Sequence, residues 1–230
     1  MATIFTHKPI IEGQRVRLRP IDVQDAPIVH RLLQDAEAAI LTGTVHCSSE
    51  TTLPWTVDEL RVTYEHWSSA DDRLVLAVID RATNAMVGEV VLNDWNESNR
   101  SCSFRTFLGA EGRGRGLGTE ATDLMVRYGI RELGLHRIAL EVYAFNPRAR
   151  HVYEKIGFRL EGTGRDALWF DGRWVDVHYM SILEGDIGPT LDAQSPTGAA
   201  EEGPATVLPG RSTVSTCGCH DRPFADDGQN

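Results

Sequence analysis

The chain has 230 residues, 41% of them hydrophobic, and a formal net charge of −10 at pH 7. This length and apolar content suit one domain of ordinary size with its own core. The acidic balance argues against a nucleic-acid partner and favours a cationic small molecule or a basic protein. Apolar runs are too short for a membrane span and the first residues lack a signal-peptide pattern, so a cytoplasmic protein is expected.

The first half of the chain mixes strand and helix patterns. Asp22 can cap a helix whose apolar stripe runs from Ala26 to Ala36. The stretch Thr56-Val57-Asp58-Glu59 fits the capping box of a second helix, which carries Tyr64 among its apolar positions. Alternation or apolar runs predict strands over residues 15–19, 74–79 and 86–92, the last two joined by a hairpin turn.

The second half predicts a strand, a glycine-rich turn and a helix in succession, followed by further elements. The expected strands are 103–108 and 137–143, and the expected helices begin after Gly118 and at Asn146-Pro147, the first being stopped by Gly134. Asp171-Gly172, between residues 168–170 and 173–175, is a strong two-residue hairpin signal. These elements predict a mixed α/β fold (α+β), with a mostly antiparallel twisted sheet flanked by helices.

Composition changes abruptly after Leu183. Residues 185–230 are rich in Gly, Pro, Ser, Thr, Ala and Asp and show no periodicity. Such a segment cannot bury enough apolar surface to offset the entropy of ordering it, so a disordered tail is expected. Residues 10–184 are expected to form the one folded domain.

The segment Arg113-Gly114-Arg115-Gly116-Leu117-Gly118 lies between the strand ending at Leu108 and the following helix. A helix start points free backbone N–H groups and the positive end of its dipole at one spot, which suits a phosphate. The three glycines allow positive φ angles and close approach of the backbone. Both arginines can add contacts to phosphate oxygens. An ATP-binding P-loop is excluded because no Gly-Lys-Ser/Thr follows.

A dinucleotide-binding fingerprint is the alternative at this loop. Gly116 to Ala121 formally fits G-x-G-x-x-A, and Glu141 stands where a ribose-binding acid would. Against this, hairpins precede and follow the unit, and the strand before the loop carries polar residues where a buried apolar run is expected. A nicotinamide-dependent oxidoreductase is the less favoured interpretation.

Two motifs together resemble the GNAT superfamily of N-acetyltransferases. Arg113-x-x-Gly116-x-Gly118 resembles its Q/R-x-x-G-x-G/A motif, and the stretch from Asn146-Pro147 through Tyr153 to Gly157-Phe158 resembles its next helix. The opening Arg15-Val16-Arg17-Leu18-Arg19-Pro20 is similar to the Rim-type branch, which acetylates ribosomal-protein N-termini. The resemblance spans residues ~14–184, in keeping with one ordinary domain.

The resemblance implies direct transfer of the acetyl group of acetyl-CoA to a primary amine in a ternary complex. Residues Arg113, Gly114, Arg115, Gly116, Leu117, Gly118 and Thr119 would hold the pyrophosphate. Phe107 and Leu108 would pair with the pantetheine through their backbone and polarise the thioester carbonyl. Asn146 would contact the cofactor, although it also suits the N-cap of its helix. Tyr153 would protonate the leaving thiolate with a pKa near the ordinary ~10, although its periodicity alone favours a core aromatic.

The general base is less determined by the sequence. Ser103 stands where Rim-type relatives often have a glutamate, so that role cannot be transferred directly. Glu89 on the preceding strand is the leading candidate, its alternative being an ordinary solvent-facing strand residue. Glu141 and Asp94 follow, and a base-free mechanism through bulk water stays open.

The acceptor is left open among a protein N-terminus, a polyamine and an aminoglycoside-like antibiotic. Residues ~22–70 are expected to select it, and they contain Glu37, Asp58, Glu59 and Glu65. A catalytically idle acyl-CoA-binding module and a homodimer also stay open. No metal is expected, because Cys217-Gly218-Cys219-His220 has no second pair to complete a tetrahedral site.

Overall fold

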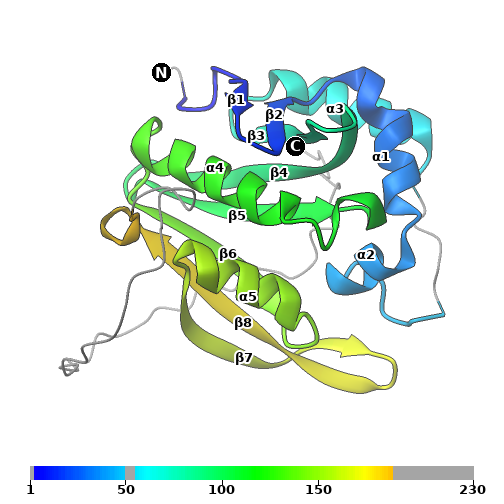
Figure 1. Cartoon of the computed structure of the whole chain (residues 1–230). Helices are drawn as coiled ribbons and strands as arrows, with labels where there is room; N and C mark the ends of the chain where they lie inside the picture. The colour runs from blue at the N-terminus through cyan, green and yellow to red at the C-terminus, as the bar shows by residue number, and fades with distance from the viewer. Residues whose placement is uncertain (1–2, 50–54, 189–230) are drawn as a thin grey trace, which may run out of the picture. The chain divides into compact units, whose positions relative to one another are not determined.

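The computed structural model describes residues 3–49 and 55–188, built around one twisted sheet in the order β1-β2-β3-β4-β5-β6-β8-β7 (Figure 1). The strands are β1 (Ile11–Glu12), β2 (Val16–Pro20), β3 (Leu74–Asp80), β4 (Ala85–Asn96), β5 (Ser101–Leu108), β6 (Arg137–Tyr143), β7 (Arg159–Phe170) and β8 (Arg173–Leu183). Within the described ranges every neighbouring pair is antiparallel except β5 and β6. The sheet confirms the mixed, mostly antiparallel expectation and excludes the dinucleotide fold, which needs a parallel doubly wound sheet.

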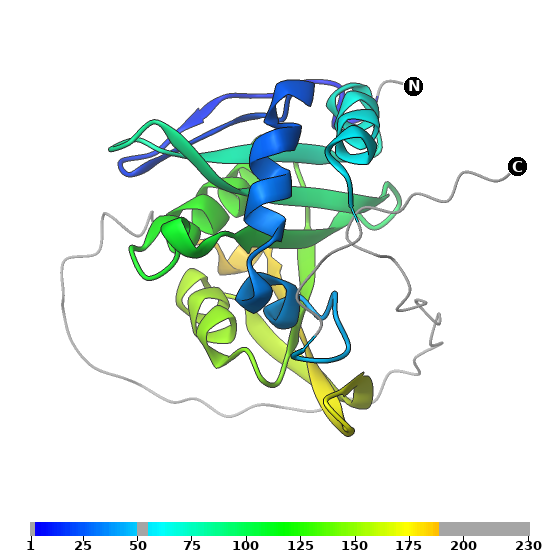
Figure 2. The same ribbon diagram turned by 90° about the vertical axis from the view of Figure 1, so that its right-hand side faces the viewer.

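Helices cover both faces of this sheet (Figure 2). They are α1 (Ala26–Leu33), α2 (Ala36–Leu41), α3 (Val57–Ser69), α4 (Leu117–Arg131) and α5 (Pro147–Ile156), with short 3-10 turns η1 (Val23–Asp25), η2 (Ala110–Gly112) and η3 (Glu184–Asp186). Tyr64 of α3 bonds Glu89 of β4, whereas Gly129 of α4 packs against Leu92. Since successive strand residues point to opposite faces, α3 covers one face and α4 the other. Helix α1 packs against α3, and α5 packs against α4.

The helix expected from Asp22 to Ala36 is interrupted. Asp22 caps only the turn η1, and α1 ends at Leu33. Asp35 then adopts an extended conformation and accepts hydrogen bonds from the amides of Glu37 and Ala38, which begins α2. The expectation of one continuous helix is therefore wrong, because a second N-cap lies inside the apolar stripe.

The closing hairpin is confirmed at its turn, where Asp171 (φ 47°) and Gly172 (φ 74°) both adopt positive φ. This is the backbone of a two-residue type I′ turn. The strands on either side extend well beyond the expected 168–175. The turn is tied to the segment after α2, since the Asp171 amide donates to the His46 carbonyl at 3.1 Å and the Ser48 amide donates to Asp171 Oδ1 at 2.8 Å.

The two parallel strands diverge along their length. Pairing of β5 with β6 covers only Ser101–Ser103 against Arg137–Ala139. Beyond it, 104–108 of β5 pairs with β4 alone, and 140–143 of β6 pairs with β8 alone. We call these two facing segments the strand divergence. Among residues 3–49 and 55–188 their facing edges have no strand partner, so their backbone groups can pair with an extended ligand.

The described elements run from Ile11 to Asp186. Most of the predicted tail, residues 189–230, lies outside the described residues, as does Cys217-Gly218-Cys219-His220. No helix in the described part of the chain is long and apolar enough to cross a bilayer. Among the same residues, no group of acidic, histidine or cysteine side chains could hold a metal ion.

Candidate active site

The glycine loop, residues 113–118, joins the turn η2 to helix α4 beside the end of β5. Gly114 (φ 73°) and Gly116 (φ 78°) adopt the left-handed conformation that favours glycine, and Gly116 forms the N-cap of α4. Gly118 is helical and does not use the positive φ that a glycine allows. Its requirement is space, because a Cβ at Gly118 would lie 2.6 Å from Leu108 Cδ1. The loop thus packs closely against the end of β5.

The backbone amides of residues 114–119 have no recorded acceptor within the described chain. Helix α4 starts in the middle of this run, and the first N–H groups of any helix lack intrahelical partners. Gly116 supplies no side chain to cap them. A run of free amides at the positive end of a helix dipole suits an anion such as a pyrophosphate.

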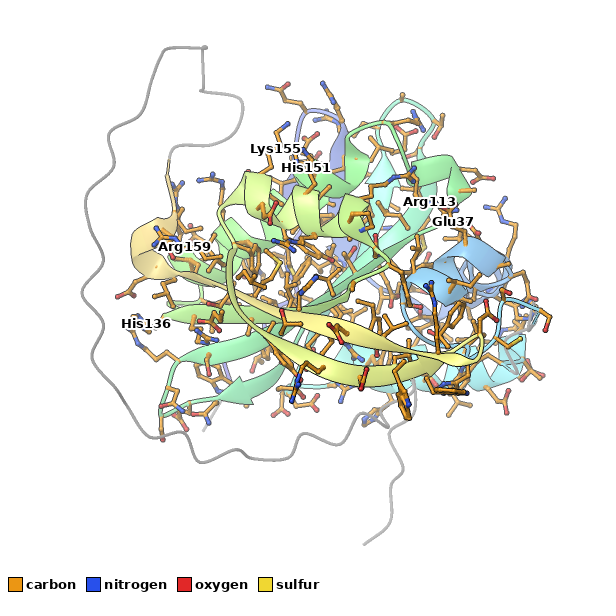
Figure 3. The ribbon with its side chains drawn as sticks, turned by 90° about the horizontal axis from the view of Figure 1, so that it is seen from below. Glu37, Arg113, His136, His151, Lys155 and Arg159 are labelled. Atoms are coloured by element: carbon orange, nitrogen blue, oxygen red, sulfur yellow. The ribbon has the colours of Figure 1, made fainter. Side chains whose placement is uncertain are left out.

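The two loop arginines are paired with acids of the protein itself. Arg113 forms ion pairs with Asp35 and, at 3.0 Å, with Glu37 of α2, and its Nη1 donates to the Leu108 carbonyl (Figure 3). Arg115 lies 2.8 Å from Asp80 of β3. The expected side-chain contacts to phosphate would require these pairs to open, whereas the free amides need no rearrangement.

Tyr153 lies on α5 with its ring buried between aromatic side chains. It contacts Phe104 of β5 edge-on, at 6.3 Å between ring centroids, and Phe158 at 5.7 Å. No hydrogen bond to its hydroxyl is recorded among the described residues, and burial raises its pKa to about 12. The expectation of an ordinary pKa is therefore wrong. A phenol of this pKa stays protonated at neutral pH, as a proton donor must.

Asn146 serves as the N-cap of α5. Its Oδ1 accepts from the Ala149 amide at 3.1 Å, and its Nδ2 donates to the Leu41 carbonyl at the end of α2 at 3.4 Å. The capping role anticipated from the sequence is observed. A cofactor contact by Asn146 stays a prediction.

Glu89 of β4 is buried, with 5% of its surface exposed, so the alternative of a solvent-facing residue is wrong. The Tyr64 hydroxyl of α3 donates to its Oε2 at 2.8 Å. Burial raises the pKa of Glu89 to about 7, while the Tyr64 hydrogen bond and the charge of Arg105 lower it. A carboxyl that titrates near neutral pH suits a general base.

Strand pairing places Glu89 and Tyr153 on opposite faces of the sheet. Glu89 is the cross-strand partner of Phe107, and Phe104, which contacts Tyr153, has the opposite parity on β5. The glycine loop begins α4, on the Tyr153 face. The strand divergence opens to both faces of the sheet, so a ligand held at the glycine loop could meet a second substrate that enters from the Glu89 face.

The remaining base candidates differ in setting. Glu141 of β6 shares the face of Glu89. Ala139, two residues before Glu141, pairs with Ser103 of β5, and Ser103 lies on the same face of β5 as Phe107, the partner of Glu89. Partial burial raises the pKa of Glu141. Asp94 is exposed at an irregularity of β4, with φ 54°.

Most acids in the expected acceptor-selecting segment already have partners within the protein. Glu37 pairs with Arg113, Asp58 pairs with Arg61 at 2.8 Å, and the Glu59 carboxylate bonds Thr56 in the predicted capping box. Residues 50–54 lie outside the described residues. Sequence reasoning missed Tyr64 as the partner of Glu89, since its helical spacing indicated only a core position.

A helix start with free amides beside two diverging strands is an arrangement suited to an acyl-CoA thioester. Comparison with known proteins identifies the family. The sequence-family model described as an acetyltransferase (GNAT) domain matches residues 15–159. The chain belongs to this GNAT family, and it is an N-acetyltransferase of the class that uses acetyl-CoA.

Individual relatives and structures agree with this assignment. The chain is 34% identical over 107 residues to a spermidine N(1)-acetyltransferase of Vibrio cholerae, covering 46% of this chain and 62% of that protein. It is 33% identical over 86 residues to the ribosomal protein uS5-alanine N-acetyltransferase of Escherichia coli, covering 37% and 44%. The sequence matches thus span less than two thirds of these relatives. The second relative confirms the similarity to the Rim-type branch.

A solved structure matches over nearly its whole length. The spermidine N-acetyltransferase of Vibrio cholerae in complex with CoA and spermine superimposes with a TM-score of 0.66 at 27% identity. The match covers 76% of this chain and 98% of that one. The fold described above is thus the fold of a CoA-binding acetyltransferase.

Proposed function

We propose that the protein transfers the acetyl group of acetyl-CoA to a primary amine of a polyamine. The observation that carries the choice of acceptor is the pair of carboxylates Glu89 and Glu141, which share one face of the sheet on either side of the strand divergence. No ion pair with a cation is recorded for either within the described chain. A polyamine carries several ammonium groups, so one can react while another is held by a carboxylate. The similarity to spermidine acetyltransferases supports the same choice.

In the proposed reaction, the amides of residues 114–119 hold the pyrophosphate of acetyl-CoA. The Leu108 amide, on the unpaired edge of β5, pairs with the pantetheine and polarises the thioester carbonyl. The Phe107 backbone faces Glu89 of β4 instead, because Gly109 and Val87, two residues further on, form a hydrogen-bonded pair of the same ladder. Arg113 and Arg115 would bind the phosphates only if their ion pairs with Asp35, Glu37 and Asp80 open. Asn146 holds the start of α5 against α2 and so fixes the helix that carries Tyr153.

Three proton transfers complete the reaction. The acceptor arrives as an ammonium ion, and Glu89 takes one proton from it. Glu89 lies on β4, and pantetheine would lie on the far edge of β5. Two strand spacings of ~4.8 Å therefore separate Glu89 from the pantetheine, which indicates that the proton passes to Glu89 through water. The neutral amine attacks the thioester carbon, the C–S bond breaks, and Tyr153 donates its proton to the leaving thiolate. The acylated nitrogen then gives its second proton to the Tyr153 phenolate, which leaves a neutral amide and restores the phenol.

The test is an acceptor panel with acetyl-CoA, followed by release of free thiol. Spermidine, an alanine-initiated peptide and an aminoglycoside represent the three acceptor classes. We expect the highest kcat/KM with spermidine, and a higher KM for spermidine in Glu141→Gln with the KM for acetyl-CoA unchanged. Preference for the peptide would overturn the polyamine assignment. CoA binding without turnover on any amine would indicate an acyl-CoA-binding module.

The cytoplasmic location and a homodimer stay predictions.

A further inference from the structure

Tyr64 and Glu89 form a buried pair between α3 and β4. Tyr64 is fully buried, and its hydroxyl donates to Glu89 Oε2 at 2.8 Å. Its ring is held edge-on against Trp67 of the same helix, at 5.6 Å between centroids. The two residues are brought together only by packing of α3 on the sheet. A tyrosine fixed in this way gives the carboxylate one defined orientation.

Charged groups on two other elements act on Glu89. Arg105 of β5 favours its ionised form, and Asp25 of η1 disfavours it. Asp25 is itself neutralised by a bidentate contact with Arg19 of β2, at 2.6 and 2.7 Å. The only hydrogen bond recorded to the Glu89 carboxyl within the described chain comes from Tyr64. Tyr64 is thus the group that divides the two oxygens into a bound Oε2 and an available Oε1.

We infer that Tyr64 is a positioning residue that orients the Glu89 carboxyl, leaves Oε1 to accept the proton from the amine, and sets the pH at which the enzyme becomes active. This inference rests on the proposed role of Glu89 as base. In this role Tyr64 acts through Glu89 and not on the acceptor or the thioester. Its hydroxyl stabilises the ionised carboxylate that burial disfavours, and hydrogen bonds to charged groups are among the stronger ones in proteins.

The test is the pH profile of kcat/KM for the full chain and its Tyr64→Phe variant, with spermidine and acetyl-CoA. The wild type should gain activity as pH rises through about 7. Loss of the hydrogen bond should move this limb up by about one pH unit. The KM for acetyl-CoA should not change, because the pair lies on the opposite face from the glycine loop. Tyr128→Phe, on α4 away from the pair, is the matched control and should keep the wild-type profile.

Glu89→Gln separates this inference from the proposed base. If Glu89→Gln keeps the acidic limb, Glu89 is not the base and the proposed mechanism fails. If Glu89→Gln removes the limb while Tyr64→Phe leaves it in place, the mechanism stands and the role of Tyr64 is wrong.

Tyr64→Phe leaves a buried carboxylate without its donor, so its folding is measured alongside activity. If the variant unfolds at pH 8, adding Glu89→Gln should restore a cooperative thermal transition, because no charge is then left unpaired. A double variant that unfolds like the single one would show that the Tyr64 hydroxyl stabilises the fold independently of the Glu89 charge, which overturns the inference.

Discussion

Arg113 of the glycine loop and Glu37 of α2 form a 3.0 Å ion pair beside the amides that would receive the pyrophosphate (Figure 3). Glu37 also lies 3.9 Å from Arg148 of α5. This one residue of α2 therefore contacts both the glycine loop and α5. The Glu37 carboxylate places negative charge where an anionic ligand would bind. Glu37 of α2 and a bound cofactor would thus compete for Arg113.

Neutralising Glu37 should therefore strengthen cofactor binding. Glu37→Gln removes a negative charge near the phosphate site and releases Arg113 from one of its partners. Partly exposed pairs of this kind contribute up to ~1 kcal/mol, so we expect the Kd of CoA to fall by up to about fivefold. Isothermal titration calorimetry at low salt measures it. Asp58→Asn, at an exposed pair on α3, is the control, and weaker binding by Glu37→Gln would contradict the competition.

Gly114 should be needed for its conformation. A Cβ at Gly114 would meet no atom within 4 Å, but φ is 73°, where other residues are strained by ~1–2 kcal/mol. We expect Gly114→Ala to weaken CoA binding or to lower the Tm, depending on whether the loop or the whole fold absorbs the strain. Gly162→Ala, which has equal space and no positive φ, should do neither. An unaffected Gly114→Ala would remove the argument for a fixed loop.

Tyr153→Phe should separate catalysis from stability. The phenyl ring keeps its contacts with Phe104 and Phe158, and the hydroxyl has no recorded hydrogen bond in the described chain to lose. We expect kcat to fall by about 10²-fold or more, as for loss of a general acid, with the Tm little changed. Steady-state kinetics and calorimetry measure both. Turnover equal to the wild type would rule out Tyr153 as the acid.

The Glu89 carboxyl should give activity and stability opposite pH dependences. Its pKa is raised from 4.5 to about 7, so the folded chain holds this proton more tightly than the unfolded chain. Its contribution to the free energy of unfolding therefore decreases as pH rises from 4.5 through about 7, while the ionised base becomes available for catalysis. Glu89→Gln should remove this part of the stability decrease and lower kcat by about 10²-fold. A wild-type pH profile of unfolding in that variant would show that Glu89 titrates normally.

Local patterns predicted much of the fold. The Asp171-Gly172 turn, the Thr56 capping box and the start of α4 at the glycine loop each depend on a few consecutive residues, and all are observed. The break at Asp35 was missed because the apolar stripe continues past it. The sheet class followed from the order of hairpins and helices.

The site was predictable only where the chemistry is local. The glycine loop presents its own backbone, so sequence could indicate it. Tyr64 and Glu89 are 25 residues apart, and Arg113 and Asp35 are 78 apart. Such pairs depend on packing between elements, which periodicity does not specify. The raised pKa values of Glu89 and Tyr153 arise from that packing too.

The most direct test is the acetyl-CoA-dependent acetylation of spermidine, with product mass and thiol release measured together for the wild type and for Tyr153→Phe. We expect a singly acetylated polyamine formed in equal amount to free CoA, and a large loss of kcat in the variant. Thiol release that is independent of spermidine, or no acetylated product from any polyamine, would contradict it.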